Sequence, residues 1–222
     1  MSERTDITMS EPSNATETPA IDSPAAGWER PIPHWSTDPF AGRTTLHGLA
    51  SDEVRSSIHK YVRLGDAEQA ILAALEMART DAEHEAEMWR RLQVLAAEDV
   101  GMGAPESITI VKALHDSADD TPPGSYDRLV FAAQAAGYLA RTVKDPINGE
   151  LMQLALHRDL APAIPDAALC VHTRRGQEMG RTMYDWFATG TTIRPEVAGR
   201  DVGPRDELLA MYLELDPPQP PG

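Results

Sequence analysis

The sequence feature that most constrains the fold is the stretch Met88–Gly101, MWRRLQVLAAEDVG. Its apolar residues Met88, Leu92 and Leu95 recur at spacings of four and three, which places them on one face of an α-helix. Such a helix should end at Gly101, because glycine adopts the left-handed conformation of a helix C-cap at little cost. The stretch therefore predicts a buried helix that ends in a glycine turn.

The same spacing of apolar residues recurs along the chain and predicts an all-α fold. No stretch of useful length alternates with a period of two, so no sheet is expected. Ser51, Asp66 and Asp81 are the expected N-caps of the first three helices. The fifth expected helix, 126–142, contains small residues that allow another helix to approach it closely, which predicts that it lies at the centre of a helical bundle. The expected helices are 51–64, 67–79, 82–100, 105–115, 126–142, 146–155 and 205–215.

Composition divides the 222 residues into three expected parts. Residues 1–45 form an acidic arm, predicted to be disordered through about residue 26 because it has almost no large apolar side chains. Its Trp28 and Trp35 lie among prolines and are expected to dock, either on the helical body or on a partner protein. Residues 46–190 form the helical domain, with its body starting near 46–51. Residues 191–222 form an extension with a proline-rich tail.

The formal net charge of −15 excludes a general binder of polyanions, because long-range repulsion opposes nucleic acid. The one cysteine, Cys170, allows neither an intramolecular disulfide nor a cysteine-based zinc site within one chain. No apolar run approaches the roughly 20 residues needed to span a bilayer. The N-terminus lacks a hydrophobic signal region, so a cytoplasmic protein without membrane contact is expected.

Motifs that carry catalysis do not occur in this sequence. There is no phosphate loop of the G-x-x-x-x-G-K-[ST] kind and no G-x-S-x-G motif. Glu83, His84 and Glu87 could in principle hold a metal, but a di-metal bundle needs a second Glu-x-x-His, which is missing. An acidic helix start that favours the helix dipole is the simpler interpretation. We therefore predict a protein that is not an enzyme, with no catalytic residue, cofactor or metal.

Two groups of charged residues are candidates for binding. Arg90 and Arg91 lie near Glu98 and Asp99, and either pair with carboxylates to hold the turn at Gly101 or form a contact surface for a subunit or nucleic acid.

The second group is the one locally basic, aromatic segment in this acidic chain. It contains His172, Arg174, Arg175, Arg181 and Trp186. It is either a solvated surface segment or a patch that faces phosphate or a partner. In the second case, Trp186 is available for stacking on a base.

Four motifs together resemble one known helical domain. They are Ile58-His59-Lys60 with Gly65-Asp66-Ala67-Glu68-Gln69-Ala70; Arg90-Arg91-Leu92 with Ala97-Glu98-Asp99-Val100-Gly101 and Pro105; Gln134–Ala140; and Pro165–Gly180. The domain is the C-terminal helical part of the replication-associated recombination protein A (RarA/MgsA) family of AAA+ ATPases, which are relatives of clamp loaders. The resemblance covers roughly residues 53–187. It implies that Glu98, Asp99 and Gly101, which belong to the matched signature, have a structural role.

This resemblance implies a bundle like the collar of clamp loaders, which in that family assembles the ATPase into a tetramer. It does not extend to an ATPase module, so ATP binding and hydrolysis are not implied. The function expected from it is a non-enzymatic oligomerisation or adaptor protein associated with DNA replication, repair or recombination. A homodimer or tetramer and a replication or repair partner are expected. A DNA-contacting module that uses the basic segment 172–181 is the alternative.

Overall fold

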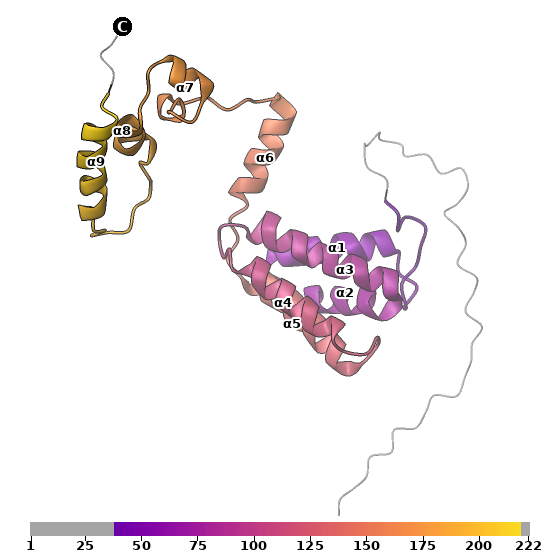
Figure 1. Ribbon diagram of the computed structural model, residues 1–222. Coiled ribbons are helices and arrows are strands. Elements are labelled where there is room, and N and C mark those ends of the chain that lie inside the picture. The colour runs from indigo at the N-terminus through magenta and orange to yellow at the C-terminus, as the bar shows by residue number, and fades with distance from the viewer. Residues whose placement is uncertain (1–37, 219–222) are drawn as a thin grey trace, which may run out of the picture. The chain divides into compact units, whose positions relative to one another are not determined.

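The computed structural model describes residues 38–218, and the terminal residues 1–37 and 219–222 are not described (Figure 1). The described residues contain helices and no β-strand, only two isolated bridges, so the predicted all-α class is confirmed. The predicted arm through residue 37, with both of its tryptophans, and the last residues of the tail lie outside the described range. The chain divides into two compact units, 1–156 and 157–222. The division falls inside the segment 46–190 that was expected to be one domain.

The first unit contains a bundle of five α-helices with a short π-helical turn, η1, and the start of a sixth helix. The bounds are α1 Ser51–Leu64, α2 Ala67–Thr80, α3 Ala82–Leu95, η1 Ala96–Val100, α4 Ser107–Asp119, α5 Tyr126–Arg141 and α6 Ile147–Arg158. The helix α5 packs against α1, α2, α3 and α4, as its small residues predicted. At Gly137 a Cβ atom would lie 3.0 Å from Ile71 Cδ1, so the missing side chain lets α2 approach α5 closely.

The core of this bundle is built on the stretch from which the fold was predicted. Met88, Leu92 and Leu95 are fully buried, as expected, and Trp89 is 1% exposed. The predicted fourth helix is displaced, since α4 runs from 107 to 119, and Ile108 is half exposed while Val111 is buried.

The caps of the first three helices were predicted with one error. Asp66 Oδ1 accepts a hydrogen bond from Gln69 N, and Asp81 Oδ1 accepts one from His84 N, so both carboxylates cap as expected. Ser51 does not cap α1, because the N-cap position belongs to Ala50. The Ser51 hydroxyl instead lies 2.8 Å from the buried ring nitrogen Nε2 of His84.

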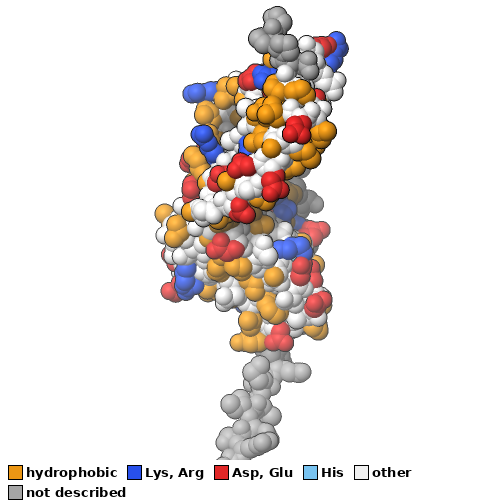
Figure 2. Space-filling model, turned by 60° about the vertical axis from the view of Figure 1, so that its left-hand side comes forward, with side chains coloured by type: hydrophobic (Ala, Val, Ile, Leu, Met, Phe, Trp, Pro, Cys, Tyr) orange, Lys and Arg blue, Asp and Glu red, His pale blue; other side chains and the backbone are white. Residues whose placement is uncertain are grey.

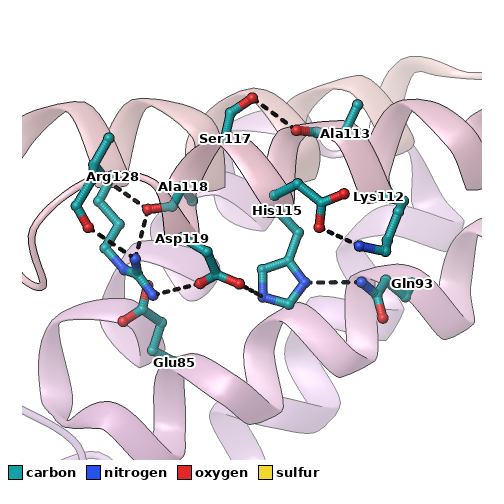
Figure 3. A network of polar contacts seen from close by, with 11 residues as sticks. Glu85, Gln93, Lys112, Ala113, His115, Ser117, Ala118, Asp119 and Arg128 are labelled. Atoms are coloured by element: carbon teal, nitrogen blue, oxygen red, sulfur yellow. Dashed lines mark hydrogen bonds and ion pairs between the residues drawn. The ribbon is translucent and has the colours of Figure 1, made fainter.

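A polar network fastens α4 and α5 to α3 (Figure 3). Arg128 of α5 donates to Glu85 of α3 at 2.5 Å and to the carbonyl oxygen of Ala118 at the end of α4 at 2.6 Å. His115 lies 2.9 Å from the Gln93 amide and stacks on Trp89, with ring centroids 4.7 Å apart. The network satisfies carbonyl oxygens at the end of α4 that have no partner within the helix.

The second unit is a set of short helices with an aromatic cluster. Its elements are η2 Asp166–Ala168, α7 Arg174–Glu178, α8 Met183–Asp185, the π-helical turn η3 Trp186–Gly190, and α9 Gly203–Leu215. Phe187 stacks on Tyr212 of α9 with centroids 5.0 Å apart. Arg205 donates to the Phe187 carbonyl oxygen at 2.7 Å, which holds η3 to α9. The predicted terminal helix at 205–215 is therefore confirmed to within two residues.

Candidate interaction surfaces

The Arg90–Arg91 pair lies on α3 around one carboxylate, that of Glu87. Arg90 donates two hydrogen bonds to Glu87, both at 2.7 Å, and Arg91 donates one at 2.7 Å. Burial by itself would raise the pKa of Glu87, but the bonds from Arg90 and Arg91 outweigh it and lower the pKa. Both arginines are thus engaged within the bundle, which favours the structural interpretation of this pair over a contact surface.

Glu98 and Asp99 lie in the π-helical turn η1, which the sequence did not reveal. A π-helical turn holds one residue more than an α-helical turn, which changes the direction of the side chains that follow it. Arg63 of α1 takes the role expected of Arg91: its Nε donates to Asp99 Oδ1 at 2.5 Å, and its guanidinium lies 4.0 Å from Glu98. This pairing ties the end of α1 to η1.

Gly101 follows η1 and has a positive φ of 51° with a ψ of −123°, so it is not in the left-handed helical region that was predicted. Backbone pairing explains this conformation. Met102 N donates to the Asp145 carbonyl oxygen at 3.1 Å, and Asp145 N donates to the Val100 carbonyl oxygen at 3.0 Å. A Cβ atom at Gly101 would lie only 2.4 Å from that Asp145 oxygen, so this close approach requires glycine.

His59 lies beside this cluster, and its Nε2 is buried without a hydrogen-bond partner among residues 38–218. Burial, together with Arg91 and Arg63, lowers the pKa of His59 from 6.5 to about 4. The fold therefore contains the neutral imidazole, whereas the unfolded chain binds a proton below about pH 6.5.

We expect the free energy of unfolding to fall by about 1 kcal/mol as the pH drops from 7 to 5, a figure that allows for solvent screening of the partly exposed ring. Below about pH 6.5 the unfolded state binds more protons than the folded state, so stability is lost as the pH falls towards the folded pKa of about 4. His59→Gln should flatten the curve of urea unfolding midpoint against pH in this range. The exposed His172 provides the control, and an equal flattening in His172→Gln would contradict the assignment.

The basic segment of the second unit does bring two of its predicted residues together. The rings of His172 and Trp186 meet edge to face with centroids 5.1 Å apart. Two of the arginines are paired with carboxylates: Arg174 with Glu178 and Arg181 with Asp166, each at 2.7 Å.

Arg175 is the remaining arginine of the predicted patch. It is exposed, and within the described ranges it has no ion-pair partner. Pairing of the other two reduces the positive charge that this segment could offer to phosphate.

A chain of hydrogen bonds joins the buried Ser51 and His84 to Asp81, and sequence reasoning missed it. Ser51 Oγ lies 2.8 Å from His84 Nε2, and His84 Nδ1 lies 2.8 Å from Asp81 Oδ1. This order of groups is that of a hydrolase triad. Ser51 is fully buried, however, and Phe40 packs edge-on against the His84 ring, so no substrate can reach the hydroxyl. We interpret the chain as a structural tie between the starts of α1 and α3.

Ser51→Ala is expected to destabilise the protein by about 2 kcal/mol, because it leaves a ring nitrogen of the buried His84 without a partner. Ser56→Ala, an exposed serine on the same helix, should change stability by less than about 0.5 kcal/mol. Chemical denaturation of both variants measures the difference. A fluorophosphonate probe should leave the folded protein unmodified, and labelling at Ser51 would contradict the structural interpretation.

The residues weighed for a metal have other partners. Glu83 pairs with Arg43, Glu87 with the arginines of α3, and His84 with Ser51 and Asp81. No group of three or more histidine, cysteine, aspartate or glutamate side chains in the part of the chain described could hold a metal ion.

The most unusual surface is that of the helix α6, which begins in the first unit and ends in the second and has no buried residue. Ile147, Leu151 and Leu154 are spaced by four and three residues and so lie on one face, and they are 43%, 53% and 39% exposed. We call these three residues the α6 stripe. Elsewhere, too, hydrophobic side chains reach the surface among acidic ones, as on the face drawn in Figure 2. The sequence predicted this helix at 146–155, but not that none of its residues would be buried.

Neither protein-family models nor curated proteins show a match to this chain. The likeness to the replication-associated recombination family therefore remains a hypothesis based on the motifs alone. Within residues 38–218, no helix is both long and apolar enough to cross a membrane.

Proposed function

We propose that this protein is a non-enzymatic helical module that self-associates and acts as an adaptor. The observation that carries the proposal is the α6 stripe, a row of large apolar side chains on a helix without buried residues. Exposed apolar rows of this kind mark interaction sites, because leaving them in water is unfavourable. Homo-oligomers are usually closed and symmetric, most often dimers and then tetramers, so we expect one of these two states.

The biological setting that we propose is DNA replication, repair or recombination, and its support is the motif resemblance. In that setting the chain would bring copies of itself, or a replication or repair protein, together. On the same resemblance we propose that the bundle is arranged like the collar of clamp loaders. We do not adopt the DNA-contacting alternative, since Arg174 and Arg181 are paired with carboxylates.

Sedimentation equilibrium at micromolar concentrations and physiological salt tests the self-association. The wild-type chain should form a dimer or tetramer, and Leu151→Glu should shift it towards monomer because the α6 stripe then carries a charge in an apolar contact. Leu156→Glu is the matched control. Leu156 is an exposed leucine of the same helix, but it lies on the opposite face from Ile147. A wild-type monomer would remove the assembly role and leave binding to a different protein.

A further inference from the structure

We infer that α6 pairs antiparallel with α6 of a second copy of this chain, with Leu154 of the two copies at the centre and with Glu150 of each copy beside Arg158 of the other. This inference rests on the proposed self-association and adds its geometry. Three observations lead to it: the spacing of the α6 stripe, the position of the two charges on α6, and the charge of α6 relative to the rest of the chain.

The spacing of the α6 stripe suits a helix as its partner. Ile147, Leu151 and Leu154 are separated by four and then three residues, which is the spacing of the contact positions in helix pairs. Arg158 continues the same row, and its aliphatic stem can cover apolar surface while its charged end stays in water. Gly149 lies on the other side of the helix, where its Cβ position is 3.4 Å from the Glu98 carbonyl oxygen, so the bundle leaves the stripe face open.

The two charges on α6 select the direction of the pair. Glu150 and Arg158 are both exposed, and neither has an ion-pair partner within residues 38–218. They are eight residues apart, about 12 Å along the helix. In a parallel pair each would meet its own copy, which is repulsive. In an antiparallel pair Glu150 of each copy would meet Arg158 of the other, which gives one ion pair at each end. The two helix dipoles would also point in opposite directions, which is a favourable arrangement.

The charge of α6 explains why copies of such an acidic chain could meet here. The chain carries a formal net charge of −15, which opposes self-association at most of its surface. Between Ile147 and Arg158 the sequence INGELMQLALHR has one glutamate and one arginine, so the formal charges of these two side chains cancel. An apolar stripe flanked by balanced charges is the kind of surface on which attraction can exceed the long-range repulsion.

Charge reversal tests the direction of the pair. Glu150→Arg and Arg158→Glu should each raise the dissociation constant at least about fivefold, because both ends of the pair then carry like charges. The double variant exchanges the two charges and should restore the wild-type dissociation constant. If the double variant instead associates more weakly than either single variant, by the sum of their two effects, the inference is overturned.

Cysteine cross-linking tests the register in a Cys170→Ser background, which removes the native thiol. In an antiparallel pair that places Glu150 beside Arg158 the centre lies at residue 154, so the two copies of Leu154→Cys lie close together and should form a disulfide under mild oxidation. The two copies of Ile147→Cys lie about 21 Å apart along the axis and should not. Disulfides in both variants would show a parallel pair and overturn the inference.

The possible failures are distinguishable. Self-association that persists with unchanged affinity in every α6 variant would overturn the pairing of α6 and leave the proposed function standing. A wild-type chain that is monomeric at tens of micromolar would overturn both, and would point to another protein as the cover of the α6 stripe.

Discussion

Glu87→Ala is expected to lower the free energy of unfolding by about 3 kcal/mol, because Arg91 and Arg90 then lose their common partner. The Glu87 side chain is only 8% exposed, and that of Arg91 is 22% exposed. The third neighbour, Arg55, lies 3.4 Å from Glu87 and would keep its pair with Asp38. Most of the loss should therefore come from the unpaired charge of Arg91, whose site is too buried for full hydration. Urea denaturation at neutral pH measures the effect.

Glu178→Ala is the matched control, since it removes the partner of Arg174 from an ion pair that also spans four residues. Here the two side chains are 58% and 92% exposed, so water replaces the lost partner. We expect a change within about 0.5 kcal/mol. Equal losses in Glu87→Ala and Glu178→Ala would show that Glu87 does not have the buried role assigned to it.

Gly101→Ala is expected to be as damaging, at about 3 kcal/mol, for two reasons that add. The residue has a positive φ of 51°, which is unfavourable for a side chain, and the new Cβ would lie 2.4 Å from the Asp145 backbone oxygen. The new Cβ atom would contact a backbone oxygen, which cannot rotate away as a side chain could. The contact can therefore be relieved only if segments 100–103 and 143–145 separate. That separation would break the two backbone hydrogen bonds that join them.

Gly48→Ala separates the two causes. Gly48 also has a positive φ, of 74°, but nothing lies within 4 Å of its Cβ position. Its substitution should cost only the conformational part, about 1 kcal/mol. Thermal unfolding of both variants gives the comparison. A Gly101→Ala variant no less stable than Gly48→Ala would mean that the two segments are not held as closely as described.

Local patterns were enough to predict most of the bundle. The apolar spacing around Leu92 identified the buried face of α3, and the carboxylates of Asp66 and Asp81 identified two helix starts, because a cap depends on only three or four neighbouring residues. Ser51 has the same local chemistry but is not a cap. Its hydroxyl is engaged by His84, 33 residues further along the chain, and no local rule contains that partner.

The candidate sites show the same limit. The partner of Asp99 is Arg63, 36 residues earlier, and the π-helical turn between α3 and Gly101 has no pattern of its own in the sequence. The packed part of the described chain also begins earlier than residues 46–51, since Phe40 is buried against His84. The helix α6 was predicted from the sequence, but the exposure of its apolar stripe depends on where the other helices pack.

Asp81 has a consequence for how the chain could be extended by insertion. It is both the last cap of α2 and the first cap of α3, so no loop separates these helices. Any insertion there would separate the C-cap position of α2 from the N-cap of α3, whose carboxylate binds His84. The connection between α4 and α5 is different, because residues 122–124 are exposed and the Cβ position of Gly124 faces open space. A tag or a whole foreign domain could therefore be grafted into that connection with α2 and α3 still joined end to end.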